Sequence, residues 1–160
     1  MRGVRSAQIL IRRYLIGLGV AAAVVALDLW TKRLAVLNFA DGDFVLIPGF
    51  LELTYVENPG VAFGFFPDGG TVVGIAALVI AIVVLVSLGT PRPGFETVVL
   101  GLVLGGAVGN LVDRVARGPG IIDGAVIDWV NLWVIPTFNV ADASITIAVG
   151  LLLIHAWRSR

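Results

Sequence analysis

The sequence predicts an all-α membrane protein with four transmembrane helices, a small β-sheet on the outer membrane surface and an outer interfacial helix. Hydrophobic residues make up 58% of its 160 residues and charged residues only 14%, whereas globular domains have about 45–50% and about 25%. Four strongly apolar stretches contain no Asp, Glu, Lys or Arg: residues 14–27, 69–91, 97–112 and 143–157. Residues 1–160 are expected to form a single membrane domain that begins with a short cytoplasmic tail, residues 1–13.

The lengths of these stretches leave two alternatives. Residues 69–91 are long enough to cross a bilayer alone, because a crossing takes about 20 residues. The other three are shorter, so buried helices of a soluble protein remain an alternative, and residues 14–27 also suit the core of a signal peptide. Four such stretches with few charges to cover them favour four spans, and a signal peptide explains only the first.

The basic residues predict the orientation of the spans. Seven of the eleven lie before the first stretch, between the second and third, or after the fourth: Arg2, Arg5, Arg12, Arg13, Arg92, Arg158 and Arg160. Because Lys and Arg favour the cytoplasmic side, both termini are expected inside the cell. Every acidic residue except Glu96 then lies on the outer side or at its membrane boundary.

The two outer loops carry different patterns. In residues 36–68, Leu51, Leu53 and Tyr55 alternate with other residues between the turns Pro48-Gly49 and Pro59-Gly60, which predicts a short strand of a surface sheet. In residues 114–138, a break at Gly118-Pro119-Gly120 precedes the apolar run 121–134. Its two tryptophans suit the headgroup level, so an interfacial helix is expected there.

The composition excludes several kinds of chemistry. The chain has no cysteine and one histidine, His155, so disulfides, thiolate sites and multi-histidine metal sites are not expected. We expect no metal and no cofactor. The formal net charge is zero, which gives no reason to expect nucleic acid as a partner.

Polar residues gather where the apolar stretches end. Asp28, Asp113 and Asp142 lie at the outer ends, and ionisable groups at membrane depth are functional candidates by default. Asp28 and Lys32 are spaced i and i+4, which predicts a helical ion pair that supports structure or binds a headgroup.

Asparagines accompany these acids. Asn58, before Gly60 in a turn, has an amide that donates to a carboxylate or a peptide carbonyl. Asn110 and Asp113 share a helical face, and Arg114 is expected to pair with Asp113 or another buried carboxylate.

Two more acids have simple structural explanations. Asp128 is a lone carboxylate in an apolar run, as an interfacial helix with one polar residue toward water would have. Asn139 and Asp142 precede the fourth stretch and suit a helix N-cap, although capping explains one of them better than both. Hydrolysis by two carboxylates that share a proton is the chemistry that these residue types support best. The residue chemistry leaves open which aspartates meet.

Five motifs occur in an order that resembles the lipoprotein signal peptidase (signal peptidase II) family over about residues 28–145. They are Asp28-x-x-x-Lys32, Asn58-x-Gly60-x-Ala62-Phe63, Gly109-Asn110-x-x-Asp113-Arg114, Val126-x-Asp128-Trp129 and Phe138-Asn139-x-Ala141-Asp142. The resemblance implies a bacterial membrane aspartic peptidase that removes the signal peptide of a prolipoprotein before its lipid-modified cysteine.

The resemblance also implies roles for individual residues. Asp128 and Asp142 would be the catalytic pair, and the other motif residues would bind substrate or support the site: Asp28, Lys32, Asn58, Gly60, Asn110, Asp113, Arg114 and Asn139. It further implies a mobile outer helix, a site near the outer face of the bacterial cell membrane, contact with membrane lipids and sensitivity to the inhibitor globomycin. We expect a monomer.

The match to the family has two departures. Trp129 stands where a Phe is more usual, and the segment from Asp128 to Asp142 is short. Asp123 lacks the motif context of Asp128 and is left out of the candidate site.

Two other classes of function remain as alternatives. A small channel or proton-coupled transporter also uses intramembrane acids, but it favours acids near the middle of the membrane and repeated halves. A non-catalytic scaffold would tolerate substitution of Asp128 and Asp142.

Overall fold

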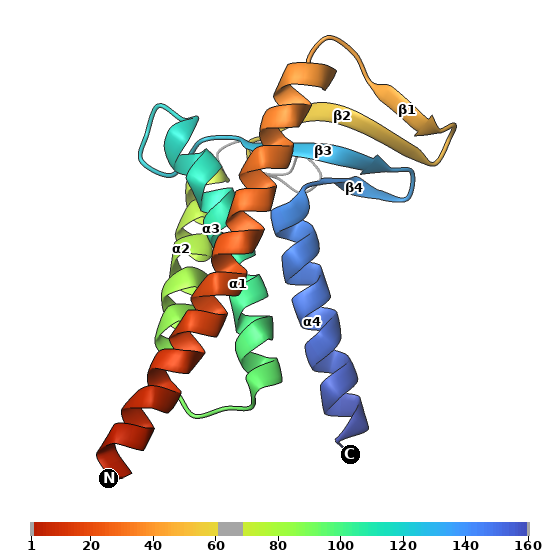
Figure 1. Ribbon diagram of the computed structural model, residues 1–160. Coiled ribbons are helices and arrows are strands. Elements are labelled where there is room, and N and C mark those ends of the chain that lie inside the picture. Colours follow the sequence, from red (N-terminus) through yellow and green to blue (C-terminus); the bar gives the residue numbers. More distant parts are fainter. Residues whose placement is uncertain (1, 61–68, 160) are drawn as a thin grey trace.

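Four helices and four strands make up the fold, with the sheet at one end of a helical bundle (Figure 1). The computed structural model describes residues 2–60 and 69–159. The elements are α1 (Arg2–Phe39), β1 (Phe44–Ile47), β2 (Leu51–Asn58), α2 (Gly70–Ser87), α3 (Gly94–Ala116), β3 (Val126–Leu132), β4 (Ile135–Phe138) and α4 (Val140–Arg158).

The four predicted spans are confirmed as helices. Each is long and apolar enough to cross a membrane: Ala7–Phe39, Gly70–Ser87, Gly94–Ala116 and Val140–Arg158. Helices α1, α3 and α4 extend beyond the charge-free stretches 14–27, 97–112 and 143–157, whereas α2 lies within the stretch 69–91. Residues 2–13, expected as a tail, form the first turns of α1. Asp28 follows the charge-free stretch 14–27 and lies within α1, which continues past Lys32 to Phe39, so the expected helical spacing of Asp28 and Lys32 is confirmed.

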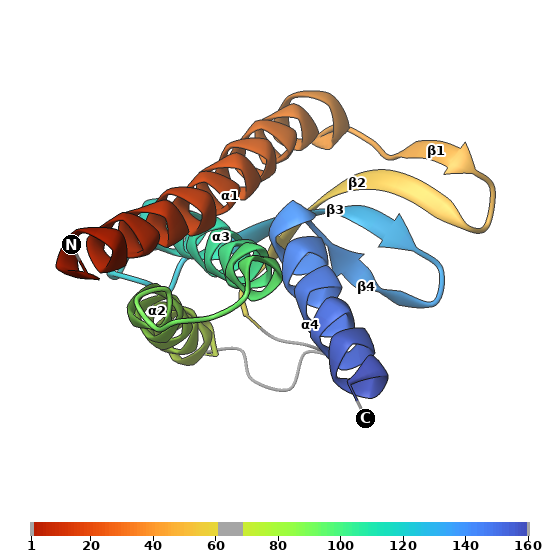
Figure 2. The same cartoon turned by 60° about the horizontal axis from the view of Figure 1, so that its bottom comes forward.

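Helix α3 is the centre of the bundle and contacts the other three helices (Figure 2). Small residues permit this close packing. A Cβ at Gly105 would lie 2.6 Å from Val24 Cβ of α1, and one at Gly106 would lie 2.5 Å from Ala141 O of α4. The absence of a side chain at Gly105 and Gly106 therefore lets α3 approach α1 and α4 closely.

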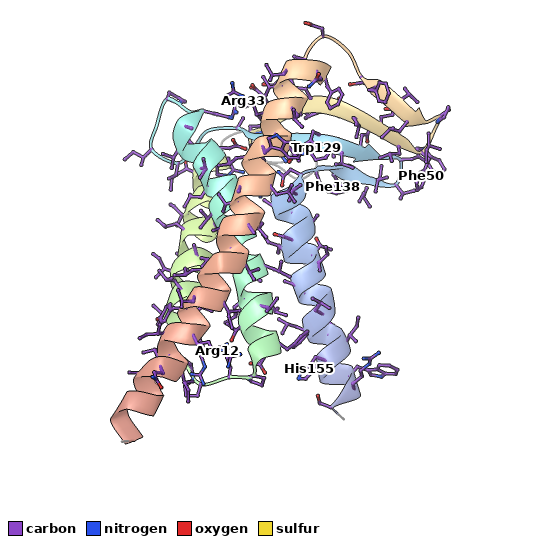
Figure 3. All side chains as sticks on the ribbon, viewed as in Figure 1. Arg12, Arg33, Phe50, Trp129, Phe138 and His155 are labelled. Carbon is purple, nitrogen blue, oxygen red and sulfur yellow. The ribbon has the colours of Figure 1, made fainter. Side chains whose placement is uncertain are left out.

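The sheet is antiparallel with the order β1-β2-β3-β4. The strand predicted around Leu51–Tyr55 is confirmed as β2, and Gly49, with φ 71°, lies in the turn that joins it to β1. The sheet extends sideways from the bundle beyond α4 (Figure 1). In Figure 3, Phe50 lies at its far end, whereas Arg12 and His155 lie at the opposite end of the bundle.

The prediction of an interfacial helix at residues 121–134 is wrong. Residues Val126–Leu132 form β3, which pairs with both β2 and β4. Val126, Ile127 and Asp128 are all buried, so this strand is covered on both faces at its start and shows a continuous apolar run. Residues 61–68 of the first loop lie outside the described residues. An outer helix within that segment, as the family resemblance implies, stays a prediction.

Candidate active site

Buried polar side chains from α1, α3, β3 and the start of α4 meet at the sheet end of the bundle. Six of them are almost inaccessible to solvent: Asp28, Lys32, Asp113, Arg114, Asp128 and Asn139. Asn58 from the end of β2, Asn110 from α3 and Asp142 from α4 complete the cluster. Every site residue predicted from the sequence therefore lies in this region or, like Gly60, at its edge.

Strand pairing places Asp128. The register of β2 on β3 sets Val56 opposite Asp128 and Asn58 opposite Val126. Asn58 Nδ2 donates to Asp128 Oδ2 at 2.9 Å, and Asn139 Nδ2 donates to Asp128 Oδ1 at 2.7 Å. Each carboxylate oxygen thus receives an amide N–H group from a different element.

The surroundings of Asp128 raise its pKa from 3.8 to about 6. Burial is the largest cause, because a charged carboxylate loses hydration there. The bonds from Asn58 and Asn139 and the charge of Lys32 act in the opposite direction, while the charge of Asp142 raises the pKa further. This carboxyl group therefore keeps its proton to a higher pH than a free aspartic acid does.

Asp142 is held by the start of α4. Asn139 is the N-cap, whose Oδ1 accepts from the Asp142 N–H at 2.9 Å, and the Asn139 N–H donates to Asp142 Oδ2 at 3.3 Å. This reciprocal capping box accounts for both polar residues, which capping was expected to explain less well. Capping does not account for the second oxygen of Asp142, which accepts from Asn110 Nδ2 at 2.8 Å.

Asn139 and Asn110 connect the two carboxylates. Asn139 Nδ2 donates to Asp128 and also to Asn110 Oδ1 at 3.1 Å, and Asn110 Nδ2 donates to Asp142. A chain of two amides therefore runs from one acid to the other. The influence of the Asp142 charge on Asp128 agrees with the closeness of the pair.

The Asp28–Lys32 ion pair is confirmed and belongs to a larger cluster. Lys32 Nζ lies 2.7 Å from Asp28 Oδ2 and 2.9 Å from Asp113 Oδ2. Asp28 Oδ1 also accepts the Ala141 N–H at 2.9 Å, and Asp113 Oδ2 accepts the Ile127 N–H at 3.2 Å. The cluster thereby fixes the backbone beside both Asp142 and Asp128.

No carboxylate among the described residues forms an ion pair with Arg114, so the expected pairing is not found in that part of the chain. Arg114 Nη1 donates to the backbone oxygens of Gly124 at 3.1 Å and Gly70 at 3.4 Å. Neighbouring helical residues point in different directions, so Asp113 faces Lys32 while Arg114 faces the ends of two loops. Gly60, with φ 106°, packs against this arginine: a Cβ there would lie 3.1 Å from Arg114 Nη1.

Sequence reasoning missed two partners in this region. Arg117 Nε lies 3.0 Å from Asp113 Oδ1, and its i, i+4 spacing from Asp113 was a signal of the kind that revealed Asp28 and Lys32. The Ala141 N–H that binds Asp28 had no such signal, because it is a backbone group brought there by the docking of α4 on α1 and α3.

An apolar pocket opens beside Asp142. It has a volume of about 310 Å³ and is lined by Ile135, Pro136 and Phe138 of β4 and by Ala143 and Ile147 of α4. No cluster of three metal-binding side chains occurs within residues 2–60 and 69–159. The carboxyl group of Asp142 is the ionisable group that lines this pocket.

Four membrane-spanning helices with two linked carboxyl groups at one end of the bundle define a membrane-integral aspartic peptidase. Residues 20–158 match the family described as signal peptidase (SPase) II. The chain belongs to this family, and it is a peptidase. Membership does not favour the channel or transporter alternative.

Individual relatives agree with this assignment. The chain is 42% identical to a lipoprotein signal peptidase of Symbiobacterium thermophilum over 139 residues, which cover 84% of this chain and 90% of the relative. It is also 42% identical to a lipoprotein signal peptidase of Rhodococcus jostii, with 84% of this chain and 69% of the relative covered.

Solved structures support the fold. A bacterial membrane enzyme determined by the in meso method at 2.3 Å resolution superposes with a TM-score of 0.74 at 30% identity, covering 89% of this chain and 87% of that one. A second such structure, at 1.9 Å resolution, gives a TM-score of 0.73 at 30% identity, with 88% of this chain and 91% of that one covered.

Proposed function

We propose that this protein removes signal peptides from diacylglyceryl-modified prolipoproteins, cleaving before the lipidated cysteine, and that Asp128 and Asp142 carry out the hydrolysis. The observation that carries the catalytic assignment is the pair of amide bridges, through Asn139 and Asn110, that joins these two carboxyl groups. Such a linked pair favours a single shared proton and distinct acid and base roles.

The surroundings of each acid suggest its role. Asp128, with its raised pKa, carries the proton, whereas Asp142 lies in the first turn of α4, where the helix dipole favours a negative charge. Asp142 accepts a proton from water as the water oxygen attacks the peptide carbonyl carbon, and Asp128 protonates the carbonyl oxygen. When the C–N bond breaks, the proton on Asp142 passes to the departing amine, and Asp128 regains its proton from the hydroxyl that becomes the new carbonyl.

The pocket beside Asp142 supports an apolar substrate. Its lining of aliphatic and aromatic side chains from β4 and α4 suits the hydrophobic part of a signal peptide near its cleavage site. The pocket lies where the sheet meets the spans, so acyl chains on the substrate cysteine remain in the bilayer while the peptide bond reaches the carboxyl groups.

The proposed location is the cytoplasmic membrane of a bacterial cell. Both termini lie in the cytoplasm and the sheet end faces outward, because basic residues occur at the opposite end of the spans. Arg12 lies there (Figure 3), and so do the α2–α3 connection, which contains Arg92, and the end of α4, which contains Arg158 (Figure 1). The site forms within one chain, so the protein acts as a monomer surrounded by membrane lipids.

Substitution of either acid tests the assignment. Asp128→Asn and Asp142→Asn are each expected to lower cleavage of a diacylglyceryl-modified prolipoprotein by at least about 10³-fold, because one proton-transfer group is lost. The measurement is a gel-shift assay with the purified protein in detergent, together with a melting curve for each variant. Asp123→Asn is the matched control: Asp123 accepts the Gly120 N–H at 2.9 Å in a turn, and its variant should cleave normally.

Two outcomes would contradict the proposal. Full cleavage by a folded Asp128→Asn protein would remove Asp128 from catalysis and revive the scaffold alternative. Globomycin is also expected to bind beside the two acids and to raise the melting temperature of the protein. An unchanged melting temperature at saturating globomycin would count against the pocket as the substrate site.

A further inference from the structure

Lys32 is a buried cation that touches neither Asp128 nor Asp142, yet it is bonded to the amides between them. It lies on α1 with a relative exposure of 1%. Its ammonium group contacts Asp28 Oδ2 at 2.7 Å and Asp113 Oδ2 at 2.9 Å, and it donates to Asn110 Oδ1 at 3.1 Å. An ammonium group has three protons, so these three acceptors use all of them.

The charges of the cluster balance. Asp28 and Asp113 contribute two negative charges, and Lys32 and Arg117 contribute two positive charges. An ion pair between α1 and α3 needs only Lys32 and Asp113. Charge neutralisation therefore does not require the bond from Lys32 to the neutral amide of Asn110. This bond instead links Lys32 to the two carboxyl groups.

Asn110 has only one orientation that satisfies its neighbours. Its carbonyl oxygen accepts from Lys32 Nζ and from Asn139 Nδ2, so both lone pairs are used. Its NH₂ group must then face Asp142 Oδ1, to which it donates at 2.8 Å. A bond to an ammonium group also polarises the amide and strengthens it as a donor.

The other two asparagines are oriented differently. The oxygen of Asn58 accepts the Gly60 N–H at 2.9 Å, and the oxygen of Asn139 accepts the Asp142 N–H at 2.9 Å. Both are held by backbone groups, whereas Asn110 is held by two side chains. The charge of Lys32 acts on Asp128 too, but its hydrogen-bonded path to Asp142 runs through one amide and its path to Asp128 through two.

We propose that Lys32 is a positioning residue that assigns the shared proton: by holding and polarising Asn110, it keeps Asp142 ionised as the base and leaves the proton on Asp128. This inference rests on the proposed catalytic pair and adds the reason for its asymmetry. The charged groups around Asp142 are Asp28 and Lys32 on α1, Asp113, Arg114 and Arg117 on α3, and Asp128 on β3. Of these, Lys32 is the cation bonded to an amide that itself binds Asp142.

The test removes the cation without leaving an unpaired buried charge. In the double variant Lys32→Met/Asp28→Asn, both members of the pair become neutral, and the asparagine that replaces Asp28 retains an oxygen for the Ala141 N–H. We expect the acidic limb of kcat against pH to move up by about one unit, so that kcat on that limb falls about tenfold. KM should stay nearly unchanged, because Lys32 is 1% exposed and is not open to substrate.

Two companion variants separate positioning from stability. Lys32→Arg keeps the positive charge, so the acidic limb of its kcat against pH should lie at the wild-type position. Leu104→Ala weakens the packing of α3 in the buried apolar core without touching a charge, so it should lower the melting temperature and leave the pH profile in place. A double variant with the wild-type profile, or with an equal loss at every pH, overturns the proposal.

A further variant keeps the proposal testable if the double variant does not fold. In Asn110→Asp, one carboxylate oxygen still accepts from Lys32, but the other faces Asp142 Oδ1 in place of the amide NH₂ group. The acidic limb of kcat against pH must therefore also move to higher pH. An unshifted limb in a folded Asn110→Asp protein overturns the proposal. Failure of the proposed function is distinguishable, since the wild-type protein would then not cleave the prolipoprotein at any pH.

Discussion

At the scale of single residues, the two central acids differ in what surrounds them. Asp128 lies on a strand, is 2% exposed, and receives one amide N–H group on each oxygen. Asp142 lies in the first turn of a helix and receives a backbone N–H as well as the Asn110 amide. Burial dominates at Asp128 and raises its pKa to about 6, so one carboxyl of the pair retains a proton at higher pH than a free aspartic acid does.

This raised pKa predicts how stability depends on pH. Between about pH 4 and pH 6 the folded protein binds more protons at Asp128 than the unfolded chain does, so this contribution to stability is present at low pH and lost as the pH rises through about 6. In Asp128→Asn that contribution is absent. The fall in melting temperature between pH 4 and pH 7 should therefore be smaller in the variant than in the wild-type protein, measured in the same detergent.

The change in melting temperature between pH 4 and pH 7 is compared between the wild-type protein and Asp128→Asn, because the other titrating groups contribute equally to both. Equal slopes of melting temperature against pH in the two proteins would mean that Asp128 has the same pKa in the folded and unfolded states, contrary to its burial. The absolute melting temperature is not the criterion, since the asparagine that replaces Asp128 would set its own NH₂ group against one of the amides of Asn58 and Asn139.

The candidate site was predictable from the sequence only in part. Spacing alone predicted the Asp28–Lys32 pair, and the motif order pointed to Asp128 and Asp142. Residue chemistry did not show which acids meet, because this depends on the β2–β3 register and on the docking of α4, which involve residues far apart in the chain. The hydrogen bonds of Arg114 were not predictable for a related reason: among the described residues its partners are the carbonyl oxygens of Gly70 and Gly124, and backbone acceptors leave no sign in a sequence.

At the scale of elements, helices were easier to predict than β3 and β4. A span is recognisable by its length and apolar composition, and all four spans were found. An apolar run of moderate length does not distinguish a buried strand from a helix, which is why the prediction for residues 121–134 was wrong. The alternating sequence of β2 made that strand recognisable, whereas the first three residues of β3 are all buried and show no such alternation.

The packing of α3 yields a prediction about glycine. Gly105→Val places new atoms where Val24 of α1 already lies, 2.6 Å from the position of a Cβ. We expect a loss of about 1–3 kcal/mol in stability, because overpacking forces the helices apart. Cleavage should fall too, since separation of α1 from α3 pulls Lys32 away from Asn110.

Two other helical glycines provide the control. A Cβ at Gly19 of α1 or at Gly150 of α4 meets no atom within 4 Å. Gly19→Ala and Gly150→Ala should therefore leave the melting temperature and the cleavage rate close to wild type. If Gly105→Val were tolerated as well as these two, α1 and α3 would not be packed as closely as the structure shows.

At the scale of the whole molecule, α1 is longer than a bilayer is thick. The span Ala7–Phe39 has 33 residues, about 50 Å at about 1.5 Å per residue, against a hydrocarbon layer of about 30 Å. A layer that begins after Arg13 ends near Leu34, so Asp28 and Lys32 lie just inside its far boundary. An unpaired charge at this depth would be costly, which agrees with the pairing of both charges within the bundle.

The resulting orientation is the last prediction. Because the chain has no cysteine, one introduced cysteine is a unique label. Asp43, exposed between α1 and β1, and Ser159, exposed after α4, mark the two ends of the bundle. In intact spheroplasts a membrane-impermeant maleimide should label Asp43→Cys, and it should label Ser159→Cys only after the membrane is opened. Labelling of Ser159→Cys alone in intact spheroplasts would place the carboxyl groups in the cytoplasm, where they would not meet a signal peptide that has already crossed the membrane.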